Sequence, residues 1–229
     1  MALLGRAAML LWYDIVPEQV AEHDEWHTRE HFPERVGIPG FLRAQRWDSV
    51  APGPRYFVVY EVRDVDVLSS PPYLERLNDP TPWTRRMMPH FRGMVRGFCR
   101  VESSVGSVLG SAAMTVRHSA APGAEAPLQR WLDRELIPDL MRQEGTTGAY
   151  TLRSDGAPAM TAEQQIRGRD AGVDRVLLVT GYSLDALTAL AHKALHADAF
   201  EAHGASPGAL SGVYALACLA DARPRDASG

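Results

Sequence analysis

Three histidines and an arginine recur at intervals of four residues near the start of the chain. They are His23, His27, His31 and Arg35, and this spacing places them along one face of a helix. A histidine titrates near neutral pH and both donates and accepts protons, so His27 and His31 predict general acid and base catalysis without a cofactor. We expect an arginine, Arg35, to stabilise the oxyanion that develops. Such chemistry suits enolisable, aromatic or polyketide-like substrates.

The same spacing is also a common metal-binding geometry. His27 and His31 lie one helical turn apart, and His23 or a carboxylate such as Asp14 or Glu61 would complete a shell for zinc, iron or copper. Spacing alone does not separate a metal or haem site from cofactor-free catalysis. Both remain open, with cofactor-free catalysis preferred, and a histidine that is simply hydrogen-bonded in the core is the ordinary alternative.

An internal repeat provides a comparison for these histidines. The segment from Trp26 reads WHTREHFP, and the segment from Trp131 reads WLDRELIP. Leucines occupy the face in the second copy that histidines and Arg35 occupy in the first, namely Leu128, Leu132, Leu136 and Leu140. A leucine stripe normally supplies a core, so imidazoles in its place indicate either a wet cavity or buried hydrogen-bond partners. We infer that the first copy carries the site and that the second is a structural partner.

Predicted elements repeat around both copies in the order βαββαβ. In the first half we expect strands at 9–15, 41–47, 56–62 and 97–102, a helix at 18–31, and a helical region at 73–77 and 83–91 that Pro80 and Pro82 interrupt. In the second half we expect strands at 112–118, 148–153, 176–182 and 213–220 with helices at 126–142 and 184–203. Each half leaves one sheet face uncovered, so packing the halves together predicts an α+β fold, a barrel of two tandem ferredoxin-like halves.

The expected boundaries are 1–105 for the N-terminal half with the site, 106–223 for the divergent C-terminal half and 224–229 for a disordered tail. The segment 157–172 has no counterpart in the first half. Its polar, glycine-containing composition predicts a surface loop or flap.

The first half contains four motifs that can be compared with known families. They are Glu25-Trp26-His27, the run from Arg29 to Arg35, Ile38-Pro39-Gly40-Phe41 and the strand from Tyr56 to Glu61. With these motifs, residues 9–103 resemble the EthD-like branch of the dimeric α+β barrel superfamily, here as a fused tandem repeat. The resemblance implies the barrel fold and singles out His31, which precedes a Phe-Pro pair as in EthD-like sequences. It leaves the reaction open among polyketide cyclases, lactone isomerases, decarboxylases, quinol-type monooxygenases and haem-binding degraders.

Other side chains are candidates for substrate binding beside His23. Tyr13, Trp47 and Tyr60 lie on predicted strands with apolar neighbours, where ordinary sheet packing is an alternative explanation. The segment 78–86, which contains Trp83 and Arg85, is rich in hydrogen-bonding and aromatic residues. We expect it to cap the pocket and to hold a carboxylate or phenolate, or else to be a solvated turn. A second pair, His192 and His196, is expected on a solvated helix face.

Composition narrows the function further. The chain of 229 residues is 45% hydrophobic and 23% charged, with a net charge of −4, which disfavours nucleic acid and anionic membranes as partners. Two cysteines are too few for a disulfide framework, and no apolar window approaches the roughly 20 residues of a membrane span. We therefore expect a cytoplasmic protein, monomeric or homodimeric.

Motifs for nucleotide binding and serine hydrolysis are absent from the sequence, as is a Cys-x-x-Cys pair. The sequence thus predicts an isomerase, cyclase or lyase acting on a small hydrophobic or aromatic molecule. A protein that only binds such a ligand is the non-catalytic alternative.

Overall fold

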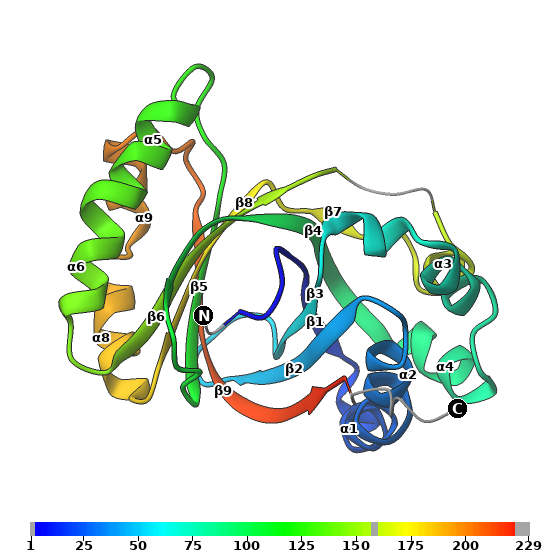
Figure 1. Cartoon of the computed structure of the whole chain (residues 1–229). Helices are drawn as coiled ribbons and strands as arrows, with labels where there is room; N and C mark the ends of the chain where they lie inside the picture. Colours follow the sequence, from blue (N-terminus) through cyan, green and yellow to red (C-terminus); the bar gives the residue numbers. More distant parts are fainter. Residues whose placement is uncertain (1–2, 157–159, 223–229) are drawn as a thin grey trace, which may run out of the picture.

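The computed structural model of the chain describes residues 3–156 and 160–222. Its long strands form a closed antiparallel barrel in the order β1-β3-β2-β9-β5-β8-β6-β4, with β4 pairing back to β1 (Figure 1). The strands are β1 (Ala7–Ile15), β2 (Phe41–Ser49), β3 (Tyr56–Val62), β4 (Phe91–Gly106), β5 (Ala112–His118), β6 (Thr146–Ser154), β8 (Arg175–Gly181) and β9 (Leu210–Asp221). This closed barrel confirms the predicted fold class.

Each half of the chain contributes four neighbouring strands with the same order. In the first half the order is β4-β1-β3-β2, and in the second it is β9-β5-β8-β6, so each half places its fourth, first, third and second strands side by side. The pairs β2–β9 and β4–β6 join the two sheets at their edges. Strand β4 begins at Phe91, earlier than predicted, because it pairs first with β1 and then with β6.

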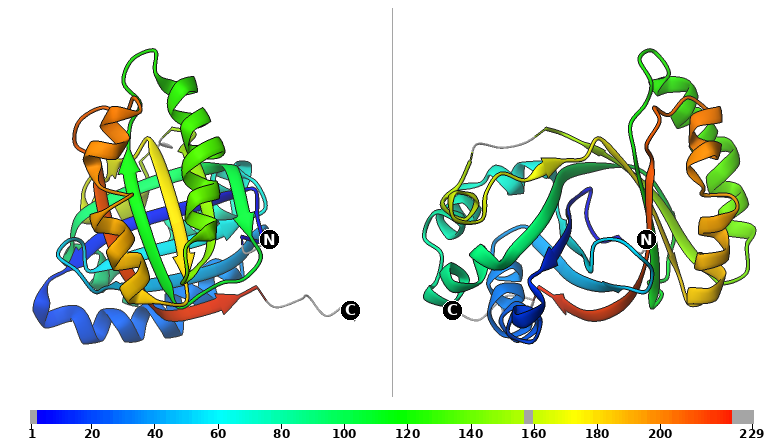
Figure 2. Two further views of the ribbon diagram at one scale, coloured as in Figure 1. Left: turned by 90° about the vertical axis from the view of Figure 1, so that its left-hand side faces the viewer. Right: turned by 180° about the vertical axis from the view of Figure 1, so that it is seen from behind.

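Helices cover the outside of the barrel in two groups on opposite sides (Figure 2). The first group is η1 (Pro17–Gln19), α1 (Val20–Trp26), η2 (His27–His31), α2 (Phe32–Val36), η3 (Val65–Ser69), α3 (Pro71–Asn78), α4 (Pro82–Met87) and η4 (Met88–His90). The second is α5 (Glu125–Trp131), η5 (Leu132–Leu136), α6 (Ile137–Arg142), α8 (Leu184–His192) and α9 (Ala197–Ala202). The predicted helix 184–203 is therefore broken between α8 and α9. The His196 side chain caps the start of α9, where it accepts a hydrogen bond from the Asp198 amide.

Alternation along the strands divides the buried residues among three cores. On β1, Met9 and Leu11 pack outward beneath the first helix group, whereas Leu10 and Trp12 fill the barrel interior together with side chains of the second half. The predicted leucine stripe of the second half is buried between its helices and its sheet. Successive residues of a strand thus face alternately toward the helices and toward the barrel axis.

The predicted surface segment 157–172 contains a helix, α7 (Ala162–Arg167), and a short strand, β7 (Ala171–Gly172), that pairs with β4. Helix α7 belongs to the second half but packs beside α3 and η4 of the first half. Residues 157–159 and the predicted tail 224–229 lie outside the described residues. Within the described ranges, no helix is long and apolar enough to cross a membrane.

Candidate active site

The three predicted histidines form a ladder of stacked rings beneath the first helix group. The ring centres of His23 and His27 are 5.1 Å apart, and those of His27 and His31 are 5.4 Å apart, with interplanar angles of 19° and 23°. The three residues are 0%, 2% and 8% exposed. The face predicted from the sequence is therefore buried against the sheet over its whole length.

A π-helical turn explains why the ladder stays aligned. In an α-helix, four residues rotate about 40° beyond a full turn, so a fourfold spacing drifts around the axis. The turn η2 forms i→i+5 hydrogen bonds and packs more residues into each turn, so the same four residues rotate less and offset the drift. The second half has an equivalent turn at η5 with leucines on this face. The turn is thus a feature of the fold, and the side chains distinguish the two halves.

His23 has hydrogen-bond partners on both ring nitrogens. Its Nδ1 lies 3.0 Å from Oδ1 of Asp24, and its Nε2 lies 3.1 Å from the Tyr13 hydroxyl. Burial alone would raise the pKa of Asp24, but contacts with His23, Arg46 and Tyr56 lower it, so this carboxylate only accepts. Nδ1 of His23 is therefore the donor, and its Nε2 accepts from Tyr13. His23 is a hydrogen-bonded core residue, as in the ordinary alternative.

His27 and His31 each retain a ring nitrogen without a partner. Nε2 of His27 lies 3.3 Å from the Tyr60 hydroxyl, and Nδ1 of His31 is 3.9 Å from the nearest Glu34 carboxylate oxygen. Among the described residues, neither Nδ1 atom has a hydrogen-bond partner. Burial is the largest cause that holds the pKa of both imidazoles well below the ordinary value, and smaller contributions come from His23 and Arg35. Both rings are therefore neutral at pH 7.

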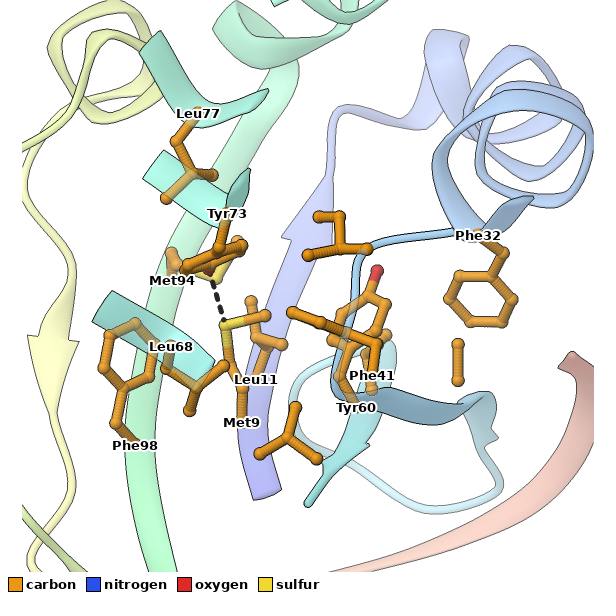
Figure 3. Packing of buried hydrophobic residues seen from close by; sticks show 14 of the residues in the cluster. Met9, Leu11, Phe32, Phe41, Tyr60, Leu68, Tyr73, Leu77, Met94 and Phe98 are labelled. Carbon is orange, nitrogen blue, oxygen red and sulfur yellow. Dashed lines mark hydrogen bonds between the residues drawn. The ribbon is translucent and has the colours of Figure 1, made fainter. Parts of the chain in front are cut away.

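These two histidines border a small cavity of about 410 Å³, a volume that includes space open to solvent. The centre of a water molecule reaches about 30 Å³ of it, which is room for about two waters. Methionines line much of its apolar surface, and in Figure 3 Met9 and Met94 lie next to Tyr73, whose hydroxyl is 3.2 Å from the Met9 sulfur. Methionine side chains are flexible and pack well against aromatic rings. These side chains can therefore move to change the shape and size of the cavity.

The far end of the cavity is charged and depends on the second half of the chain. Arg35 is 1% exposed, with Nη2 2.7 Å from Glu163 of α7 and Nη1 3.1 Å from Glu34. Arg167 of α7 and Arg96 of β4 complete this end. Glu163 and Arg167 were not predicted as site residues, because nothing in the primary sequence relates the 157–172 segment to the first half. Arg96 was not predicted either, because it precedes the strand expected at 97–102.

Some predicted site residues do not join this cavity. Trp47 is buried inside the barrel, on the opposite face of the sheet from the histidines. Trp83 is half-buried on α4 and donates to Glu22, and Arg85 is 53% exposed beside Asp79. The structure therefore brings together His27, His31, Arg35, Tyr13 and Tyr60, and it places Trp47, Trp83 and Arg85 elsewhere. His192 and His196 are exposed, as predicted.

The two carboxylates predicted as further metal ligands, Asp14 and Glu61, do not lie beside the histidines. Asp14 is exposed and accepts from the Arg55 amide, and Glu61 lies on the other face of β3, where it accepts from Gln45. In the part of the chain that the structure describes, no three His, Cys, Asp or Glu side chains are grouped to hold a metal.

Comparisons with known proteins show the fold. No protein-family model and no curated protein matches the chain. An anthrone oxidase-like protein superimposes with a TM-score of 0.69 at 12% identity, over 100% of this chain and 99% of that one. A proposed monooxygenase from Lactobacillus acidophilus NCFM gives 0.58 at 8%, over 94% and 96%. A mutant chlorite dismutase from Candidatus Nitrospira defluvii gives 0.52 at 12%, over 93% and 94%. This chain thus shares the fold of dimeric α+β barrel proteins.

Proposed function

We propose that this protein is an enzyme that moves a proton within a small aromatic or polyketide-like ketone, without a cofactor. The observation that carries the proposal is the pair of buried, neutral imidazoles of His27 and His31, each with an unpartnered Nδ1, beside a methionine-lined cavity. A buried polar atom without a hydrogen-bond partner lowers the folding stability by about 1–3 kcal/mol. A ligand that supplies the missing hydrogen bond offsets this loss. Leucines at the equivalent positions of the second half avoid this cost.

In the proposed reaction, the lone pair of His27 removes a proton from a carbon next to the substrate carbonyl. His31 donates a hydrogen bond from its neutral ring to the enolate oxygen and so stabilises the developing charge. The His27 imidazolium then returns the proton to another atom of the conjugated system. Because the buried ring holds a proton weakly, this return is favourable. No electrons are gained or lost, so isomerisation or cyclisation needs no oxidant.

The resemblance to EthD-like sequences supports a small-molecule substrate, and it suggests that the two halves descend from one duplicated unit. The likeness to an anthrone oxidase-like protein supports an aromatic ketone. Because one chain closes its own barrel, dimerisation is not needed to complete the fold, and a monomer or a homodimer is consistent with the proposal. A ligand-binding protein without activity is the competing function.

Proton exchange tests the proposal directly. The protein is incubated with 2-indanone or 2-tetralone in D2O, and loss of the C–H signal next to the carbonyl is followed by NMR. We expect the folded His27→Leu and His31→Leu variants to lose about 100-fold or more in exchange rate. The matched control is His192→Leu, on the exposed face of α8, which keeps the wild-type rate.

Unchanged exchange in both His27→Leu and His31→Leu contradicts the proposal. Tight binding of these ketones by the wild type without any exchange favours the competing function of a binding protein. Circular dichroism of each variant confirms that a lost rate is not a lost fold.

A further inference from the structure

Arg96 separates the buried cavity from a cleft on the surface. It lines the cavity on one side, and on the other it lines a cleft with about 530 Å³ of empty space beside α7 and β7. Its side chain is only 7% exposed. A charged side chain buried to this degree normally has partners for its several N–H donors, since an unpaired buried charge is costly.

The guanidinium of Arg96 lacks most of those partners. Its Nε lies 3.0 Å from Oδ2 of Asp170, and its carbon lies 5.0 Å from the centre of the Phe98 ring. Among the described residues, Nη1 and Nη2 have no hydrogen-bond partner. Burial lowers the pKa of Arg96, as expected for a cation that its surroundings do not fully solvate.

The neighbours of Arg96 are held firmly in place. Asp170 also accepts from Nε and Nη2 of Arg167, at 3.0 and 2.8 Å, and from Nε2 of Gln164, at 3.0 Å. One carboxylate therefore serves two guanidiniums. The nearest other carboxylate, Glu163, is 3.9 Å from Arg167 and is engaged at 2.7 Å with Arg35. This arrangement holds Nε of Arg96 beside Asp170 and leaves the Nη1 and Nη2 edge of Arg96 without a carboxylate among the described residues.

We propose that Arg96 binds a carboxylate group of the substrate, so that the substrate is an aromatic carboxylic acid. The two free Nη atoms lie on one planar edge, which matches the two oxygens of a carboxylate. To admit the ring of the ligand, the flexible side chains of Met9 and Met94 move apart, and the carbonyl of the ligand then lies toward the histidines. This inference names the substrate class of the proposed function and rests on it.

Calorimetric titration with 2-naphthoate and 2-naphthamide tests the inference, because the two probes share a ring system and differ in charge. We expect wild-type protein to bind 2-naphthoate at least about tenfold more tightly, since hydrogen bonds to charged groups contribute about 1.5–3 kcal/mol. Arg96→Gln removes this preference, and Arg96→Lys, which keeps the charge without the planar edge, retains part of it. The matched control Arg85→Gln, at an exposed arginine, keeps the full preference.

Equal affinity for the two probes, no binding of 2-naphthoate by the folded wild type, or a preference that survives Arg96→Gln overturns the inference. The result is separable from the proposed function. The double variant His27→Leu, His31→Leu retains the preference for naphthoate if Arg96 binds the carboxylate, even though it loses proton exchange. If the histidine variants lose proton exchange but the wild type shows no preference for the carboxylate, the proposed function stands and this substrate class is wrong.

Discussion

The Arg35 guanidinium and the Glu163 carboxylate meet at 2.7 Å although they lie 128 positions apart in the sequence. Arg35 is on the histidine face of the first half, and Glu163 is on α7 of the second. Both side chains are almost completely buried, at 1% and 5% exposed. The contact therefore ties the insert of one half to the cavity of the other and forms part of the cavity wall.

Replacing Glu163 by glutamine is expected to loosen this contact. Glu163→Gln leaves Arg35 with only Glu34 for its charge, so we expect the free energy of unfolding in urea to fall by about 1–3 kcal/mol. Amide hydrogen exchange in α7 is expected to quicken. The matched control is Glu25→Gln, which breaks an exposed pair with Arg29 and costs less than about 1 kcal/mol. Equal effects from the two variants would show that the buried pair is not structurally important.

Stability is expected to fall in mild acid because of the histidine ladder. Burial lowers the pKa of His23, His27 and His31 in the folded protein, so the unfolded chain binds protons first as the pH falls. Stability is therefore full above about pH 6.5 and declines below it, by up to about 1.4 kcal/mol per pH unit for each ring that stays neutral.

Urea denaturation between pH 4.5 and 8 measures this decline. The double variant His27→Leu, His31→Leu should show a shallower slope than the wild type, since it retains only His23 of the ladder. It should also be at least as stable at pH 7, because leucine leaves no unpartnered ring nitrogen in the core. An unchanged slope in the double variant would refute the role of these rings.

Chelation is expected to leave the activity intact. Among residues 3–156 and 160–222, no group of metal-ligating side chains surrounds His27 and His31, and the proposed proton transfer uses only the imidazoles. We expect untagged protein to carry far less than one equivalent of metal and to keep its exchange rate after dialysis against EDTA. Stoichiometric metal or a haem absorption band that disappears in the double histidine variant would instead support the metal or haem alternative.

Trp47→Phe is expected to separate barrel packing from substrate binding. Trp47 fills the barrel interior, so the smaller ring leaves a void and lowers the free energy of unfolding by about 1–3 kcal/mol. The exchange rate and the affinity for 2-naphthoate should remain at wild-type values, because the cavity lies on the other face of the sheet. A weaker affinity with an intact fold would return Trp47 to the substrate-binding residues.

Local patterns in the sequence were sufficient for the fold and for the histidine face. The leucine stripe of one copy and the histidines of the other share a spacing, and spacing along a helix determines which side chains face the sheet. The strands 56–62 and 112–118 end where predicted, because a short, mostly apolar run between polar or turn-forming segments marks a strand directly. The spacing therefore identified the two histidines, His27 and His31, that border the cavity.

Only the tertiary structure decided which side chains share the cavity with that pair. Trp47 and Tyr60 are both strand aromatics, and the pleat sends one to the barrel axis and the other to the histidines. Arg96 on β4 and Glu163 on α7 are far apart in the sequence. They line the same cavity because α7 of the second half packs against the helices of the first half. Contacts of this kind depend on how the two sheets close on each other, and no local pattern of residues encodes that closure.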